Sequence, residues 1–348
     1  MKAMTFCKRF LILSCLLTGT TAVAQDIHFS QFYEAAILRN PALTGIFSDD
    51  YKVGVIYKNQ WSSISKPYQT GLVSGELRIP VKGEASDFVS VGLLAFYDKA
   101  GSIDLQTIGV YPAVNYNKSL HDASNSFLSV GFTGAYLQRS YDPNKATFNN
   151  QYQNGSYSVY NPTGEQLSNP KITQWDAGAG VSFNSTAGES KNINYFIGAA
   201  GYHFTKPKSS LYNNELIRLQ MKWEGNAGLS MKLASPFSIM VQANYAQQGT
   251  YREIIAGAAL GWNLMRDEKE KLFSLNAGAY YRVGDAIIPM IRLEYKDFAI
   301  GMTYDVNISK LKAASSTRGG LELTLFKTGI LHEPNFEKSR TTCPQFFD

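Results

Sequence analysis

Residues 298–308 read Phe-Ala-Ile-Gly-Met-Thr-Tyr-Asp-Val-Asn-Ile, and every second residue is large and apolar. The apolar set is Phe298, Ile300, Met302, Tyr304, Val306 and Ile308. Successive side chains of a β-strand point to opposite faces, whereas a helix would mix these residues around its surface. The stretch is therefore predicted to be a strand with one apolar face and one small, polar face.

The same alternation returns along most of the chain. It recurs in residues 174–184, 221–233, 237–245 and 273–281. A soluble sandwich also alternates, but its strands usually have about 5 to 6 residues, whereas these segments extend over about 10 to 14, which is enough for a tilted membrane crossing. Trp175, among other aromatic residues, lies near the end of an apolar face, as in the girdles at lipid headgroups. The pattern predicts an all-β fold, a transmembrane antiparallel β-barrel.

About fourteen strands are expected between residues 51 and 327, although twelve or sixteen also fit. They are residues 51–60, 67–80, 86–97, 104–117, 125–138, 171–184, 192–205, 219–233, 236–248, 251–264, 271–283, 286–296, 297–308 and 318–327. An even number puts both ends of the chain on the periplasmic side, and the connections that follow even strands are the short ones. The longest connection, residues 139–170, is expected outside the cell as a recognition surface, a plug folded into the lumen or a solvated loop.

The two ends of the chain lie outside this strand pattern. Residues 1–24 carry Lys2, Lys8 and Arg9, an apolar stretch and a small-residue site before Gln25, which indicates a secretory signal peptide. Its removal would leave one cysteine, Cys343, so no internal disulfide is expected. Residues 25–50 are expected to be a periplasmic N-terminal segment and residues 328–348 a periplasmic C-terminal tail.

The composition and the sites that are absent restrict the function. The chain has 33 Lys and Arg against 28 Asp and Glu, and three of the cations lie in the leader, so nucleic acid is not an expected partner. The four histidines lack the paired spacing of a metal site, and no nucleotide or hydrolase motif is present, so no cofactor and no catalysis are expected. His203 is a candidate catalytic base, but a polar wall position is favoured for it, in the lumen if Phe196, Tyr202 and Phe204 face lipid. Lumenal charges such as Arg292, Glu294 and Lys296 would line a conduction path or pair across strands.

Motifs at both ends of the mature chain resemble one family. Phe29-Ser30-Gln31-Phe32-Tyr33 and Asn40-Pro41-Ala42 look like the opening of the PorP/SprF family of type IX secretion system membrane proteins. Residues 300–309 and 319–323 resemble its closing strands. Gly320, Leu323 and Leu325 also have the form of the signal that the barrel-insertion machinery reads.

The resemblance implies a component of the type IX protein secretion and gliding machinery in the outer membrane. Its implied partners are outer-membrane lipid, periplasmic ring lipoproteins, a peptidoglycan-binding protein and a large secreted adhesin. Phe29, Phe32, Tyr33, Asn40 and Pro41 are candidates for docking these partners, or alternatively for plugging the barrel mouth. The alternative function is a passive channel or a hydrophobic-solute transporter, and no small-molecule substrate is identified.

Overall fold

A computed structural model gives the structure of most of the chain after residue 25. The described residues are 26–62, 66–81, 86–120, 122–165, 169–188, 190–211, 214–266, 271–310 and 312–331. The expected signal peptide at 1–24 and most of the expected C-terminal tail, including Cys343, lie outside them.

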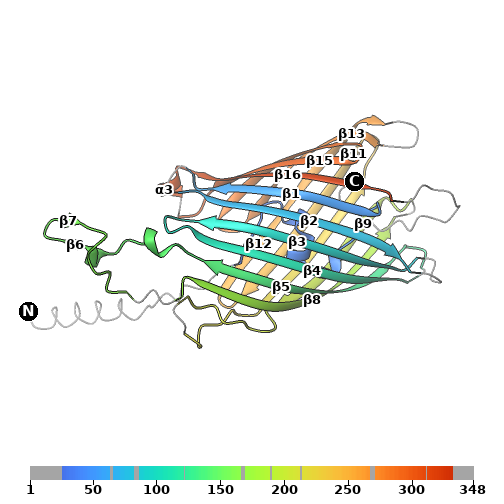
Figure 1. Ribbon diagram of the computed structural model, residues 1–348. Coiled ribbons are helices and arrows are strands. Elements are labelled where there is room, and N and C mark those ends of the chain that lie inside the picture. Colours follow the sequence, from blue (N-terminus) through green and yellow to red (C-terminus); the bar gives the residue numbers. More distant parts are fainter. Residues whose placement is uncertain are drawn as a thin grey trace, which may run out of the picture.

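Fourteen antiparallel strands close into one barrel (Figure 1), which confirms the predicted fold. The first strand, β1 (Tyr51–Gln60), pairs with the last, β16 (Arg318–Gly329), along its whole length. The others are β2 (Tyr68–Pro80), β3 (Phe88–Ala100), β4 (Leu105–Ser119), β5 (Phe127–Ser140), β8 (Lys171–Ala187), β9 (Ile193–Tyr202), β10 (Lys222–Lys232), β11 (Phe237–Gln248), β12 (Tyr251–Arg266), β13 (Lys271–Arg282), β14 (Ala286–Tyr295) and β15 (Phe298–Asn307).

The two ends of the barrel differ in their connections. The chain enters β1 and leaves β16 at the same end, which also carries the short connections and is called here the turn end. The opposite end, called the loop end, carries residues 141–170, 203–221 and 308–317. In Figure 1 the loop end is marked by α3 (Lys312–Ser315) and by the small hairpin of β6 (Tyr152–Gln153) and β7 (Ser156–Tyr157). The remaining short helices of this end are η3 (Pro143–Lys145) and η4 (Asn149–Gln151).

The outer surface of the barrel is apolar, as the alternation predicts. Trp175 is 70% exposed and Met302 is 46% exposed, whereas Thr303, the next residue, is 1% exposed because it faces the lumen. A band of such side chains surrounded by water would be unfavourable, so lipid is the expected solvent of this surface.

The side chains of β9 point in other directions than the sequence suggests. The condition that Phe196, Tyr202 and Phe204 face lipid is not met, because Phe196 and Tyr202 are buried in the lumen and Phe204 alone of the three is exposed. Large apolar residues occur on both faces of this strand, since Ile197 points outward, so the contrast between its faces is weak. The strand also ends at Tyr202, and His203 therefore begins a loop instead of lying in a strand.

Met302 gives a direct test of which face meets lipid. Met302→Lys should destabilise the inserted barrel by roughly 2–4 kcal/mol, because a charge near the bilayer midplane loses its hydration. Met302→Leu, which keeps size and polarity, should cost less than about 1.5 kcal/mol. Urea unfolding from lipid vesicles measures both. Equal stabilities of the two variants would show that Met302 does not face lipid.

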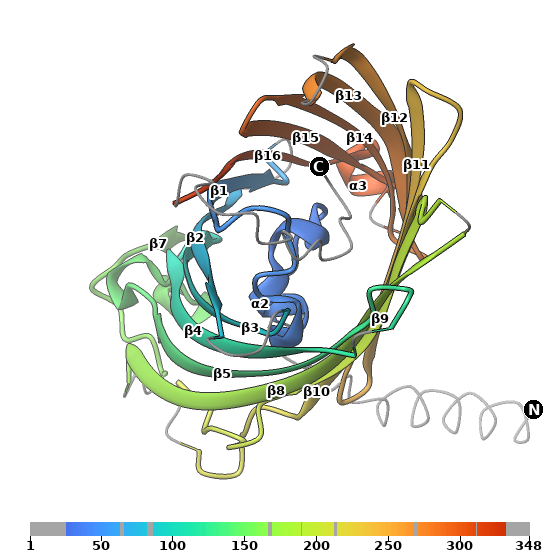
Figure 2. The same cartoon turned by 90° about the vertical axis from the view of Figure 1, so that its right-hand side faces the viewer.

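Residues 26–50 lie inside the barrel (Figure 2), and this segment is called here the plug. It contains the short helices η1 (Phe32–Glu34), α2 (Ala36–Arg39) and η2 (Pro41–Leu43). No described helix of the chain is long and apolar enough to cross a membrane. The expectation of a periplasmic N-terminal segment is corrected for these residues, because their apolar side chains are buried against the lumenal wall.

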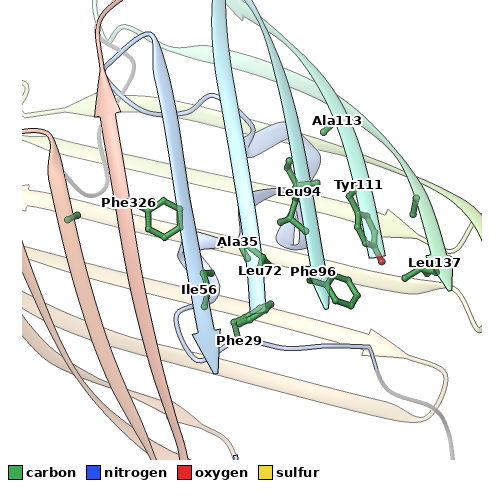
Figure 3. Close-up of a cluster of buried hydrophobic side chains, with 13 residues drawn as sticks. Phe29, Ala35, Ile56, Leu72, Leu94, Phe96, Tyr111, Ala113, Leu137 and Phe326 are labelled. Carbon is green, nitrogen blue, oxygen red and sulfur yellow. The ribbon is translucent and has the colours of Figure 1, made fainter. Parts of the chain in front are cut away.

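Two apolar clusters join the plug to the wall. In the first (Figure 3), Phe29 and Ile37 pack with Ile56, Leu72 and Phe326. In the second, Phe32 and Tyr33 contact the ring of Tyr280 at centroid distances of 5.4 and 5.6 Å. Each fully buried apolar side chain contributes roughly 1.5–3 kcal/mol, so the plug is bound to the wall and not simply enclosed by it.

Candidate functional site: the plug and the loop-end vestibule

The segment before η1 is held against the wall through two backbone amides. The Glu322 carboxylate of β16 accepts hydrogen bonds from the backbone N–H of Ser30 at 2.8 Å and of Gln31 at 2.7 Å. The Ser30 hydroxyl donates to Asp305 of β15 and accepts from Arg282 Nη2 at 3.1 Å. Charge-assisted bonds of this kind are among the stronger hydrogen bonds in proteins, so they fix the position of the segment before η1.

An ion-pair group holds η1. Glu34 lies against Arg292 of β14, and its other carboxylate oxygen is 2.8 Å from Lys52 Nζ of β1. Arg292 Nε also donates to Glu294 in the same strand at 2.7 Å. The sequence offered conduction or pairing across strands as roles for Arg292 and Glu294, whereas the structure pairs Arg292 with Glu294 of its own strand and with Glu34 of the plug. Lys296, the third residue of that prediction, is exposed in the turn before β15 and lies over the ring of Tyr295.

Arg39, at the end of α2, reaches the opposite part of the wall. Its guanidinium donates to Asn244 Oδ1 at 3.0 Å, to Gln242 Oε1 at 3.1 Å and to the Ala243 carbonyl at 3.0 Å. The group also lies 5.2 Å from the ring centroid of Phe196. The plug is thus attached to β11 as well as to the β14–β16 side of the barrel.

The Asn40-Pro41-Ala42 segment fits against glycines. The Asn40 side chain accepts from the Ala42 backbone N–H at 2.9 Å and donates to the Val181 carbonyl of β8 at 3.1 Å. A Cβ atom at Gly131 would lie 2.3 Å from the carbonyl carbon of Pro41, and one at Gly180 would lie 2.0 Å from Asn40 Oδ1. The wall therefore lacks side chains where the plug backbone approaches it most closely.

After η2 the plug turns toward β1. The Asn115 amide of β4 donates to the carbonyls of Ala42 and Thr44 at 2.9 and 2.8 Å. Gly45, with φ of +77°, donates its N–H to Glu76 at 2.7 Å. A residue with a side chain would be strained at this φ and would also meet Ser90, so Gly45 is required for the turn.

A histidine between two carboxylates fixes the start of the plug at the loop end. His203 Nδ1 is 2.6 Å from Asp176 Oδ2, and His203 Nε2 is 2.8 Å from Asp26 Oδ2. Lys222 Nζ lies 3.7 Å from the same Asp26 oxygen. Burial alone would lower the pKa of His203, but the hydrogen bonds to Asp176 and Asp26 outweigh it and raise the pKa to about 9.

This histidine should make attachment of the plug depend on pH. The stabilisation is complete below the ordinary histidine pKa of 6.5 and is lost as pH rises through about 9, where the ring loses its proton. Hydrogen exchange of the amides of residues 27–31, corrected for the intrinsic rate, should therefore accelerate near pH 9. His203→Gln should exchange faster at neutral pH and lose this pH step. An unchanged step in that variant would assign it to other groups.

A vestibule lies above the plug at the loop end. This cavity has a volume of about 540 Å³. Leu38 of the plug and Phe96, Tyr111 and Leu137 of the wall form its apolar part. Its polar lining includes His203 and Arg139, so the cavity could accept a ligand with both apolar and polar parts.

The residues predicted to dock partners lie in the lumen. Phe29, Phe32, Tyr33, Asn40 and Pro41 are all buried in the plug, so a partner outside the barrel does not meet them in this structure. Of the two readings that the sequence left open, the placement agrees with plugging.

The residues of the predicted assembly signal lie in β16. Gly320 is buried and pairs with Gln60, while Leu323 and Leu325 face outward. Their role as a signal stays a prediction.

Sequence reasoning missed the residues that receive the plug. Glu322, Asp305 and the inward glycines have no shared motif, although charged residues inside otherwise apolar strands were a signal that could have indicated them. No group of His, Cys, Asp or Glu arranged to hold a metal ion occurs in the part of the chain that the structure describes.

The fold and this site define a transmembrane β-barrel whose lumen holds its own N-terminal segment. The sequence matches the family described as "Type IX secretion system membrane protein PorP/SprF" over residues 21–325. The chain therefore belongs to the PorP/SprF family of type IX secretion system membrane proteins.

Solved structures with similar folds include a toluene transporter and a monoaromatic hydrocarbon channel. The toluene transporter TbuX of Ralstonia pickettii has a TM-score of 0.51 and 10% identity, over 89% of this chain and 96% of that one. The monoaromatic hydrocarbon channel CymD has a TM-score of 0.49 and 10% identity, over 86% and 93%. At this identity the likeness concerns the fold alone. No curated protein matches the chain.

Proposed function

We propose that this chain is a non-catalytic outer-membrane component of the type IX secretion and gliding machinery that supports export or surface attachment of a large adhesin. The observation that carries the proposal is the family match over residues 21–325. Residues 1–24 would direct export as a signal peptide. The loop end would then face outward and the turn end the periplasm.

The plug supports a structural role instead of conduction by an open lumen. Three plug side chains reach the wall: Glu34 contacts β14, Arg39 contacts β11 and Asn40 contacts β8. In the other direction, Glu322 of β16 binds the backbone of the plug. Attachment to so many strands makes the barrel a rigid body, which suits a component that holds other proteins at the membrane.

The proposed periplasmic partners would meet the turn end. Ring lipoproteins and a peptidoglycan-binding protein need a surface accessible from the periplasm, and the buried aromatic residues of the plug do not provide one. Asp297, in the turn before β15, and Leu331, after β16, are exposed at this end. The tail expected at 328–348 begins inside β16, which ends at Gly329, so only the residues that follow Gly329 are proposed to extend the same surface.

Site-specific crosslinking in cells tests this assignment. A photoreactive residue at Asp297 or Leu331 should capture periplasmic secretion components, whereas one at Tyr160, in the loop-end segment 141–170, should capture a secreted surface protein. Met302 serves as the control, because a probe there should capture lipid. If the turn-end probes capture no secretion component in a strain that secretes normally, the proposed function is wrong.

Gly320, Leu323 and Leu325 are proposed to act during insertion of the barrel. Leu323 and Leu325 are exposed on the outer face of β16, the strand that closes the barrel against β1. A contact with the insertion machinery could therefore form before closure.

A second candidate is a passive channel or a transporter of hydrophobic solutes. The vestibule, which opens at the loop end and has an apolar part, favours it. Planar-bilayer recordings separate the candidates: a steady current through the purified, intact protein would favour the channel, and a closed barrel would favour the secretion role.

A further inference from the structure

The vestibule contains a buried hydrogen-bond donor without an acceptor. The indole N–H of Trp61 is buried and lacks a hydrogen-bond acceptor among the described residues. Arg282, by contrast, is engaged at all three nitrogens: Nη1 donates to Asp285 and Asp305, Nη2 donates to Ser30, and Nε lies 3.8 Å from the Glu253 carboxylate. Buried donors are nearly always paired in folded proteins, so the Trp61 indole indicates a ligand group with an acceptor oxygen.

The charges of the cavity indicate that this group is an anion. Arg139, near the end of β5, lines the cavity, and no carboxylate of the described residues lies within ion-pair distance of its guanidinium. Asp26 and Asp98 interact with it only at longer range. Lys58 donates to a neutral acceptor, the carbonyl oxygen of His28, at 2.9 Å.

The acidic residues of the lining already have partners. Asp26 contacts His203 and Lys222, Asp98 accepts from the Thr70 hydroxyl at 2.6 Å, and Asp285 pairs with Arg282. Glu253 accepts from the Tyr251 hydroxyl at 3.0 Å and lies 3.8 Å from Arg282 Nε. The positive charge that remains would attract a negatively charged ligand from solution.

The apolar part of the cavity specifies the rest of the ligand. The rings of Phe96 and Tyr111 are stacked with centroids 6.1 Å apart, and Leu38 and Leu137 complete this surface. A volume of about 540 Å³ lies within the roughly 300–1,000 Å³ of small-molecule sites. A simple inorganic anion would leave this apolar surface uncovered.

We propose that the vestibule binds a carboxylate attached to an apolar or aromatic body. The carboxylate pairs with Arg139 and accepts a hydrogen bond from the Trp61 indole N–H, and the body packs on Phe96, Leu38 and Leu137. A free carboxylic acid and the carboxyl terminus of a peptide share this chemistry. The proposal stands on the cavity and does not depend on the secretion assignment.

Calorimetric titration of the full mature chain in a nonionic maltoside detergent tests the proposal. The probes are 3-phenylpropionate, N-acetyl-Phe-Leu with a free carboxyl terminus, and the amides of both. The acids should bind saturably and the amides about tenfold or more weakly, because a bond to a charged partner is lost. The amides also correct for partition into micelles. Tighter binding of 3-phenylpropionate would indicate a free carboxylic acid as the ligand, and tighter binding of N-acetyl-Phe-Leu would indicate the carboxyl terminus of a peptide.

Variants assign the binding to named groups. Arg139→Gln should lower the affinity for the acids by about tenfold or more. Trp61→Phe keeps a ring but removes the donor, and it should lower this affinity by about threefold to tenfold. Trp175→Phe, on the outer face, is the matched control and should bind as the parent does. Heat-modifiable migration on gels confirms that each variant is folded. Absence of saturable binding, equal binding of acids and amides, or full binding by Arg139→Gln would each overturn the proposal.

Discussion

Gly131→Val is expected to displace the plug and to turn a closed barrel into one that conducts ions. The first atom of the new side chain would lie 2.3 Å from the carbonyl carbon of Pro41 and 2.4 Å from the Ala42 nitrogen. Both are backbone atoms, which cannot rotate away as a side-chain end can, so the segment must leave its position. Planar-bilayer recording of the purified variant measures the current.

Gly134→Val is the matched control in the same strand. Gly134 faces outward, and a Cβ there would meet only Pro112, at 3.8 Å. This variant should keep the conductance of the parent chain. Equal currents from the two variants would show either that the plug is absent from this position or that it does not close the lumen.

Glu34→Leu should be the most destabilising change within the plug. It would leave Arg292 and Lys52 facing an apolar side chain, and removing one partner of a buried ion pair typically costs about 3–5 kcal/mol. Hydrogen exchange of the plug amides gives the free energy of its release. Glu215→Leu is the control: Glu215 pairs with Lys208 at the surface, where an ion pair contributes about 0–1 kcal/mol.

A double-mutant cycle separates the ion pair from other effects of the leucine. Arg292→Met removes the cation, so Glu34→Leu combined with Arg292→Met should cost less than the two single changes together. Strictly additive costs would mean that Glu34 and Arg292 do not interact, and would contradict their placement in the structure.

The barrel could be predicted from the sequence because its signal is local. In residues 298–308 the alternation between Met302 and Thr303 decides which side chain faces lipid, and the structure agrees. The prediction failed in β9, where Phe196 and Ile197 are both large and apolar, because the two faces then carry no contrast.

The plug could not be predicted because nothing local specifies it. Residues 26–50 have neither strand nor helix periodicity, and their position is decided by groups far along the chain. The amide of Ser30 is bound by Glu322, 292 positions away. The inward faces rich in glycine, alanine, serine and asparagine agreed with a crowded lumen, but residue type alone does not say which segment occupies it.

The bond between Ser30 and Glu322 also limits the order in which the molecule can mature. The segment that precedes the barrel in the chain is held in part by the last hairpin of the barrel, so the contacts of Ser30 cannot form until β15 and β16 are in place. Contacts this distant in sequence form late, since a long loop must be closed before they give any stabilisation. A nascent barrel would therefore hold its N-terminal segment incompletely during biogenesis, and full anchoring of that segment would report that the last hairpin has closed the barrel.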